Sequence, residues 1–281
     1  MGIKLKQMIK KVIFIVLITV LICCACKQTE PSVFWKEPLT GMEFVLIPKG
    51  SFTMGNHLRN DTSSFKIPHK VTLSKDFWLA RTEVTQQQWQ IIMGTDEIHP
   101  KKPSPFRNTN PRYPVVSISY FDIQKFLEIL NNLSKEITFR LPTEAEWEYA
   151  CSVGTKTPFS TGYHISDAQA NFNAEIPSEF STLGNNIGHP LPVASYPPNS
   201  WGLFDMHGSV WEWVADWYAP YSPEHAIDPQ GPQVGKNKVI RGGSWYFGAN
   251  NATSSARRKH EPELWGFSIG FRIVCERQMI D

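Results

Sequence analysis

Apolar residues recur at helical spacing between Ser119 and Leu133. Serine is a residue type that caps helix N-termini, so Ser119 marks a plausible start. The residues that follow it place an apolar stripe along one side of a helix, at Phe121, Ile123, Phe126, Leu127, Ile129, Leu130 and Leu133. The pattern predicts an amphipathic helix over this segment.

A capping box predicts a second helix. Thr143 is followed three residues later by Glu146, directly after Pro142, and the first turn is acidic, which suits the positive end of a helix dipole. A third, short helix is predicted from Thr85 to Met93.

Short apolar or alternating runs between turn residues predict strands. They cover Phe44–Ile47, Lys70–Leu73, Val239–Arg241 and Phe271–Val274. The 21 Pro and 18 Gly, together with the absence of an internal repeat, indicate an α+β chain with much irregular structure.

Charge and composition exclude some classes of function. The chain has 281 residues, 28 Lys+Arg against 26 Asp+Glu, and 41% hydrophobic residues, which is a globular composition. A net charge of +2 supplies no basic stripe, so we expect no nucleic-acid partner.

The N-terminus predicts a signal peptide over residues 1–25. Lys4, Lys6, Lys10 and Lys11 precede an apolar run from Val12 to Ile22, which has the length of a signal-peptide core. An ordinary membrane anchor is the alternative, but a spanning helix needs about 20 apolar residues. Either reading places the body outside the cytoplasm, and we expect a linker over 26–40 and one domain over 41–281.

The end of this run, Leu21–Cys26, resembles the lipobox of bacterial lipoproteins, in which a cysteine is acylated and becomes the mature N-terminus. Cys26, preceded by Ala25, fits best, and Cys23 and Cys24 remain alternatives. The sequence thus predicts a protein anchored by lipid in the bacterial cell envelope, in the periplasm or on the outer-membrane surface.

Two cysteines, Cys151 and Cys275, remain in the mature chain. Zinc would need further ligands at characteristic spacing, and none are present. In an oxidising compartment we therefore expect a disulfide between them.

A series of ordered motifs resembles the formylglycine-generating enzyme, or sulfatase-modifying factor, family across Gly41–Glu276. The motifs are Phe44–Gly55, Pro68–Leu73, Glu83–Thr85, Arg140–Ala150, Gly202–Trp213, Arg241–Trp245 and Ile269–Arg272. The resemblance implies the family's variant of the C-type lectin fold, an α+β fold with little regular secondary structure. It also implies a half-disulfide at Cys151, with Cys275 two residues beyond the usual partner position and hence on the same face of a strand.

The family's oxidase chemistry needs paired thiols that hold Cu(I), and soft thiolates are what that ion requires. The corresponding positions here are Phe247 and Ala252, so the resemblance predicts a member that uses no copper and is not an enzyme. A related branch of iron enzymes uses a histidine cluster, whereas the eight histidines here are scattered.

Calcium is the metal that the resemblance implies. One site would use side-chain oxygens of Asp205 and Glu212 with carbonyls of Gly208 and Val210. A second would use the side chains of Asn171 and Asn185 with the carbonyls of Phe172 and Ile187, and Asn185 replaces the family's acid. The alternative is that these segments are turns organised by Asx hydrogen bonds.

The segment 245–268 is the candidate binding loop, because it mixes aromatic and adaptable polar residues as binding loops do. It also resembles the variable regions that diversity-generating retroelements rewrite in lectin-fold display proteins, including treponemal surface lipoproteins. The expected contacts to an unidentified macromolecular ligand are Tyr246, Phe247, Asn250, Asn251, Arg257, His260 and Trp265. Trp265 and Phe267 could instead be buried in the fold.

Three functions therefore compete. The first is a surface or periplasmic lipoprotein that binds a ligand through its lectin-like face. The second is a formylglycine-generating oxidase, which the missing thiols disfavour. The third is an accessory structural component of the cell envelope.

Overall fold

The computed structural model describes residues 33–55, 67–94, 110–134 and 136–276. The predicted signal peptide and Cys23, Cys24 and Cys26 lie outside these residues. Within them, no helix has the length and apolar character that a membrane span requires.

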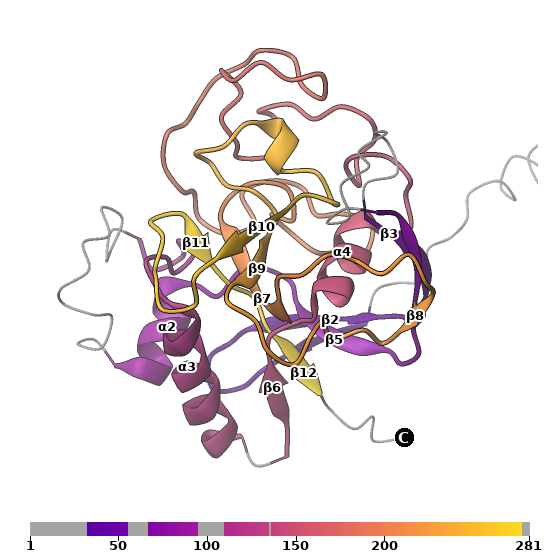
Figure 1. Cartoon of the computed structure of the whole chain (residues 1–281). Helices are drawn as coiled ribbons and strands as arrows, with labels where there is room; N and C mark the ends of the chain where they lie inside the picture. The colour runs from indigo at the N-terminus through magenta and orange to yellow at the C-terminus, as the bar shows by residue number, and fades with distance from the viewer. Residues whose placement is uncertain (1–32, 56–66, 95–109, 135, 277–281) are drawn as a thin grey trace, which may run out of the picture. The chain divides into compact units, whose positions relative to one another are not determined.

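A five-stranded sheet joins the two ends of the domain. Its order is β1 (Phe34–Lys36), β2 (Glu43–Ile47), β5 (Phe77–Ala80), β12 (Val274–Glu276) and β6 (Thr138–Arg140). The C-terminal strand β12 thus lies between β5 and β6 and pairs antiparallel with both (Figure 1). β1 falls within the expected 26–40 linker, and the compact unit begins at Val33.

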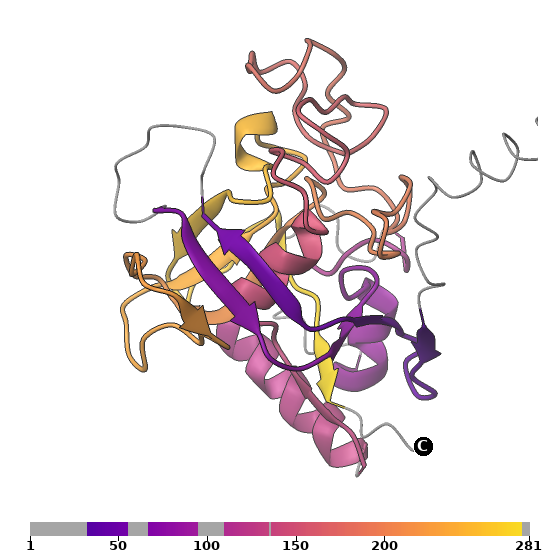
Figure 2. The ribbon, with the colours of Figure 1, turned by 90° about the vertical axis from the view of Figure 1, so that its right-hand side faces the viewer.

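Two smaller sheets complete the strands. One has the order β10 (Arg257–His260), β9 (Lys238–Arg241), β7 (Trp211–Trp217) and β11 (Ile269–Gly270). The other has the order β3 (Gly50–Met54), β4 (His69–Leu73) and β8 (Ala226–Ile227). Figure 2 shows β3 and β4 side by side, as their antiparallel register requires.

The expected strand Phe271–Val274 is wrong in its bounds. β11 ends at Gly270 and β12 begins at Val274, and the two strands belong to different sheets. Residues 271–273 cross between the sheets because Arg272 is buried there, where its guanidinium donates to both carboxylate oxygens of Glu212 at 2.7 Å. A pattern of apolar residues cannot reveal such a change of partner.

The predicted helices are confirmed as α2 (Gln86–Met93), α3 (Tyr120–Leu133) and α4 (Glu144–Ser152). Each begins with a capping box, formed by Thr85 with Gln88, Ser119 with Asp122, and Thr143 with Glu146. In each box the N-cap hydroxyl accepts an N3 amide hydrogen and the N3 side chain accepts one from the N-cap amide. Each helix start depends on residues within one turn of it, so the sequence could locate these starts.

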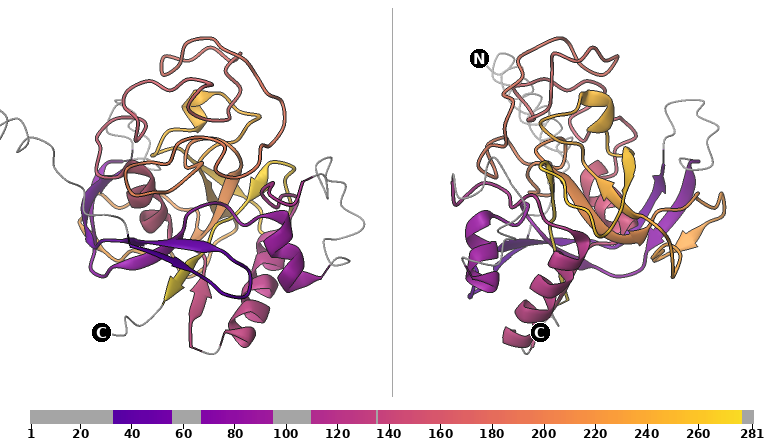
Figure 3. Two further views of the ribbon diagram at one scale, coloured as in Figure 1. Left: turned by 180° about the vertical axis from the view of Figure 1, so that it is seen from behind. Right: turned by 60° about the vertical axis from the view of Figure 1, so that its left-hand side comes forward.

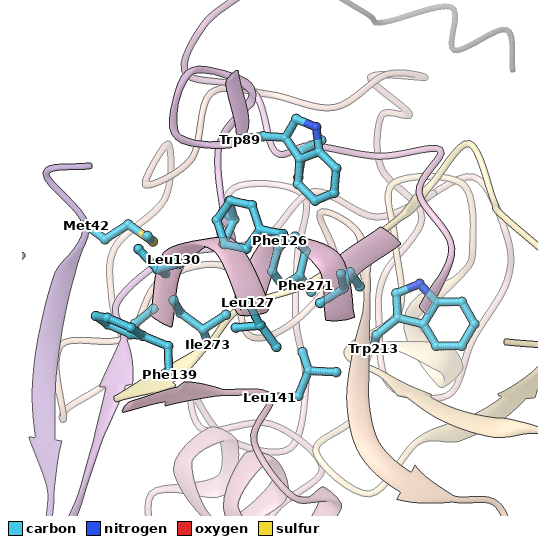
Figure 4. Close-up of a cluster of buried hydrophobic side chains, with 14 of the residues drawn as sticks. Met42, Trp89, Phe126, Leu127, Leu130, Phe139, Leu141, Trp213, Phe271 and Ile273 are labelled. Carbon is cyan, nitrogen blue, oxygen red and sulfur yellow. The ribbon is translucent and has the colours of Figure 1, made fainter. Parts of the chain in front are cut away.

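Two large apolar clusters flank the five-stranded sheet. One packs α2 and α3 against β2 and the crossing segment, through residues such as Trp89, Phe126 and Phe271 (Figure 4). The other packs α4 against β4 and β5. Successive residues of β12 separate between them: Val274 belongs to the α4 cluster and Cys275 to the α3 cluster.

The predicted disulfide is not formed, and the alternation along β12 explains why. Cys151 lies in α4, within the cluster that Val274 joins, whereas the Cys275 side chain points to the other face of the sheet. The Cys151 sulfur instead lies 3.6 Å from the hydroxyl of Ser254 and near the ring of His207. The expected bond would have to pass through the sheet.

Much of the irregular chain gathers at one end of the domain. Residues 155–205 lie there together with the short 3-10 helix η1 (Ala249–Asn251), at the end away from β6 and β12 in each view (Figures 1, 2 and 3). η1 at this end contains Asn250 and Asn251, two of the residues that the sequence proposed for binding, whereas Arg257 and His260 lie on β10.

Candidate functional site

Two glycines turn the chain from β9 into the candidate loop. Gly242 and Gly243 have φ values of 94° and 77°, a left-handed backbone that side chains rarely adopt. A Cβ on Gly243 would lie 2.8 Å from the carbonyl oxygen of Asn251 and 3.0 Å from Ala252. The tight turn therefore brings residues 244–252 back over themselves and fixes the loop at its base.

The loop carries a cluster of rings, here called the aromatic surface, made of Trp245, Tyr246, Phe247 and Phe267. Tyr246 lies at its centre, 5.3 Å from Phe267, 5.5 Å from Phe247 and 5.6 Å from Trp245, all close to edge-to-face. Tyr246 is 52% exposed and Phe267 37%, whereas Trp245 is buried. The cluster thus has a buried side that holds the rings in place and an exposed side that a ligand can contact.

A segment far away in the sequence forms a rim beside the aromatic surface. The amide of Asn173 donates to the carbonyl of Phe247 at 3.0 Å, and Ser178 donates to Asn250 at 2.7 Å. Ile176, which is 42% exposed, packs against Gly248, where a Cβ would come within 2.9 Å of it. No sequence pattern indicates this rim, because 72 residues separate Ser178 from Asn250 in the chain.

Phe247 and Ala252, where the resemblance would place the family's thiols, have different surroundings. Phe247 is half-buried, with its ring 5.9 Å from that of Trp211. Ala252 is fully buried in a cluster with Phe159, Phe172 and other apolar residues. Both positions present hydrocarbon, and one of them is core.

Arg257, an expected ligand contact, is instead a buried structural residue. Its guanidinium donates to both carboxylate oxygens of Glu144 at 2.7 Å and lies over the rings of Tyr218 and Tyr221. Arg241 forms an ion pair with the same carboxylate. Because β10 alternates its side chains, Arg257 points inward to α4 while Arg258 points outward to the aromatic surface.

The other predicted contacts are at least partly accessible. Asn250 is exposed, and Asn251 and Trp265 are half-buried. His260 is also half-buried, 5.2 Å from the ring of Trp213, and burial lowers its pKa. Phe267, which could have been core, is on the surface.

The first predicted calcium site contains more acidic side chains than basic ones. Glu212 is already bound by Arg272 and by the indole N–H of Trp147 at 2.8 Å. Asp205 accepts the amide hydrogen of Ala194 at 2.7 Å, and burial raises its pKa to about 6. Against the single charge of Arg272 stand these two carboxylates and a third, Glu83, that the sequence analysis did not select.

Glu83 is the least satisfied of these acids. It is fully buried, and neither carboxylate oxygen has a hydrogen-bond partner among the described residues. Burial and the neighbouring Asp205 raise the pKa of Glu83 well above its usual value. A buried, unpaired carboxylate is costly, so this arrangement fits the charge of a divalent cation.

The backbone of this site is joined to both the second predicted site and the candidate loop. Ser209, between Gly208 and Val210, donates its amide hydrogen to the carbonyl of Asn171 at 2.8 Å. The carbonyl of Ser209 accepts from Trp245 at 2.9 Å, and Gly208 donates to Gly242 at 2.7 Å. Any ion that orders residues 205–210 would therefore also stiffen the base of the loop.

The second predicted calcium site has one well-placed oxygen. The Oδ1 of Asn171 is buried without a partner among the described residues, as a vacant ligand would be. Phe172 is buried, whereas Asn185 and Ile187 are exposed. Asn185 donates to the carboxylate of Asp167 through its backbone N–H at 2.8 Å and its side-chain Nδ2 at 3.1 Å, so an acid lies next to the asparagine.

In the described part of the chain, no three acidic, His or Cys side chains converge as a metal-binding group.

A cavity of about 990 Å³ lies away from the loop, between β12, β6 and the segment 228–233. Among its charged residues, Arg140 binds Glu146 through two bonds and Glu276 through a third, each 2.7 Å long. None of residues 245–268 lines it.

Comparison with known proteins is consistent with this geometry. Residues 30–277 match the family described as the sulfatase-modifying factor enzyme 1-like domain. A formylglycine-generating enzyme of Bos taurus is 30% identical over 196 residues, covering 67% of this chain and 50% of that protein. One of Streptomyces coelicolor is 31% identical, covering 75% of this chain and 68% of that protein. The chain spans about half the length of the mammalian relatives it matches.

Solved structures show the same fold. Treponema denticola variable protein 1 superposes with a TM-score of 0.70 at 24% identity, covering 88% of this chain and 99% of that one. PvdO from Pseudomonas aeruginosa superposes with a TM-score of 0.71 at 26% identity, with the same coverage.

Proposed function

We propose a binding function, without catalysis, for this chain, which belongs to the sulfatase-modifying factor enzyme 1-like family. It is a lipoprotein of the bacterial cell envelope, anchored through Cys26, and it recognises a macromolecular ligand with the aromatic surface. Calcium at the Asp205 site stiffens the base of that surface.

The observation that carries this proposal is what occupies the thiol positions. Phe247 is half-buried among rings of which Tyr246 and Phe267 are exposed, and Ala252 is part of the core. Neither side chain can bind Cu(I), so the family's oxidation of a client cysteine lacks its metal ligands here. Exposed aromatic rings held by a rigid base are instead what binding surfaces use, because they supply contact area with little loss of conformational entropy.

The calcium part of the proposal rests on unsatisfied oxygens. Asp205 and Glu83 would supply carboxylate oxygens, and Gly208 and Val210 main-chain carbonyls, which is the hard oxygen set that Ca²⁺ prefers. Glu212 orients Arg272 and Trp147 and would contribute at most one lone pair more. The ion would balance buried charge and hold the 205–210 segment against Gly242 and Trp245.

An assay for aldehyde formation separates binding from catalysis. The full chain is incubated with a peptide carrying the target cysteine of a sulfatase, with oxygen and Cu(I), beside an active formylglycine-generating enzyme. We expect no aldehyde by mass spectrometry from this chain. Aldehyde above the no-protein background would show that the chain is an oxidase and would contradict the proposal.

A screen on peptide and glycan arrays tests the binding surface itself. Replacing Tyr246 and Phe267 together by serine should abolish the signals of the wild type while its melting temperature changes by only a few degrees. The matched control is Phe121→Ser, since Phe121 is also 52% exposed but lies on α3 outside the loop. Equal losses in both variants, or no ligand at all, would favour an accessory structural component.

A further inference from the structure

Arg258 is the one arginine that β10 directs onto the aromatic surface. It is exposed, and its guanidinium carbon lies 4.7 Å from the ring centre of Phe247 and 5.7 Å from that of Trp211. Within the described residues no carboxylate forms an ion pair with it. Its neighbour Lys259 is also exposed but, one residue along the strand, points to the opposite face.

This stacked position prepares Arg258 to bind an anion. A guanidinium whose carbon lies over an aromatic ring is attracted to the ring face and can still use the N–H donors at its edge. Such a fork matches a carboxylate with two parallel hydrogen bonds, and stacking removes much of the entropy that a free arginine loses on binding. Arg257, whose fork already holds Glu144, shows that geometry one residue away.

The surroundings of Arg258 favour a protein carboxylate over other anions. Binding to an anionic membrane or a nucleic acid needs several basic residues, whereas Glu175 is exposed beside Ile176 on the rim. A stacked sugar needs an open ring face, and the face of Phe247 under Arg258 is covered. β10 is also the edge of its sheet, and a sheet edge accepts an extended peptide.

We propose that the partner is a protein that presents an extended segment with one acidic side chain beside an apolar one. Its Asp or Glu carboxylate binds Arg258, and the apolar side chain packs on Tyr246 and Phe267. This inference rests on the proposed binding function and adds the chemistry of its ligand.

The test is selection of linear peptides from a random phage-displayed library on the full chain, in parallel with the variants Arg258→Gln and Lys259→Gln. Peptides selected on the wild type and on Lys259→Gln should be enriched in Asp or Glu next to an apolar residue, and those from Arg258→Gln should not. For a selected synthetic peptide, Arg258→Gln should weaken binding roughly tenfold or more. Arg258→Lys should bind with intermediate affinity because the ammonium lacks the planar fork.

A double-mutant cycle assigns the contact. Changing the peptide's acid to its amide should weaken binding to the wild type but have little further effect on Arg258→Gln. Peptides without acidic enrichment, or equal effects of Arg258→Gln and Lys259→Gln, would overturn the inference. If binding in that case still depends on Tyr246 and Phe267, the proposed function stands. A preference for sulfated or uronic-acid glycans would also overturn it. If no probe binds, both proposals fail.

Discussion

At this site the role of a residue depends on where its side chain points and what it contacts, more than on its amino-acid type. Arg257 and Arg258 are adjacent arginines, yet one is enclosed between Glu144 and two tyrosine rings and the other lies on the surface. Glu83 and Glu148 are both buried acids, yet the Glu148 carboxylate accepts from Arg241 and Gly55, while the Glu83 carboxylate has no hydrogen-bond partner among the described residues. The same chemical group is a structural support in one place and an unsatisfied ligand in another.

The two arginines make a matched pair for mutation. Arg257→Ala leaves the buried carboxylate of Glu144 with less compensation and should lower the free energy of unfolding by roughly 3 kcal/mol. Arg258→Ala should change it by less than about 0.5 kcal/mol, as exposed substitutions do. Urea denaturation measures both, and a stable Arg257→Ala protein would contradict the buried ion pair.

The buried thiols should be reduced and slow to react. Burial raises the pKa of Cys151 to about 12, so little thiolate exists at neutral pH. Alkylation of the folded protein at pH 8 should leave Cys151 unmodified, and denaturation without reductant should expose both Cys151 and Cys275 to the reagent. Peptide mapping by mass spectrometry reads each site separately, and a linked Cys151–Cys275 peptide would restore the disulfide.

At the scale of elements, the segment 205–212 connects the predicted metal site to the binding loop. It begins beside Glu83, passes through left-handed residues at Asp205, Gly208 and Ser209, and enters β7 at Trp211. Its hydrogen bonds to Gly242 and Trp245 join it to the turn that carries the aromatic surface. Order in this segment should therefore set the order of the loop.

Removing calcium tests this connection. Chelation with EGTA should lower the melting temperature, because an ion that binds only the folded state stabilises it by mass action. Glu83→Gln should melt higher than the wild type in EGTA, since an unpaired buried charge is gone, but gain less from added calcium. Glu261→Gln, an exposed acid, is the control. Identical melting curves with and without EGTA would contradict the calcium site and would mean that residues 205–212 only form turns.

At the scale of the whole molecule, the fold brings the two ends of the domain together. β12, near the end of the described chain, lies inside the five-stranded sheet between β5 and β6, and β1, near the start of the described chain, forms one edge of the same sheet. The loops gather at the far end from β12 (Figure 1). The domain thus offers one end for recognition, and the proposed anchor precedes β1 in the sequence.

The anchor is tested by changing its acyl acceptor. Cys26→Ala should move the protein from the membrane fraction to the soluble fraction, because more than one acyl chain is needed for stable anchoring. Incorporation of labelled palmitate should be lost in the same variant. Retained label would move acylation to Cys23 or Cys24, tested by the corresponding alanine variants.

The sequence by itself determined two things: the family, and those features that depend on residues three or four positions apart, such as helix starts. The capping boxes at Thr85, Ser119 and Thr143 fixed the helix starts, because donor and acceptor lie within one turn. The ordered motifs identified the family and hence the lectin-like fold.

Only the tertiary structure decided which residues meet and which way they point. The crossing at 271–273, the separation of Cys151 from Cys275 by a sheet, and the rim at 173–178 all depend on partners far away in the sequence. A one-residue step along β10 or β12 moves a side chain to the opposite face, and composition carries no record of that step. For this reason the sequence selected Arg257 as a candidate contact, whereas the fold buries Arg257 and exposes Arg258.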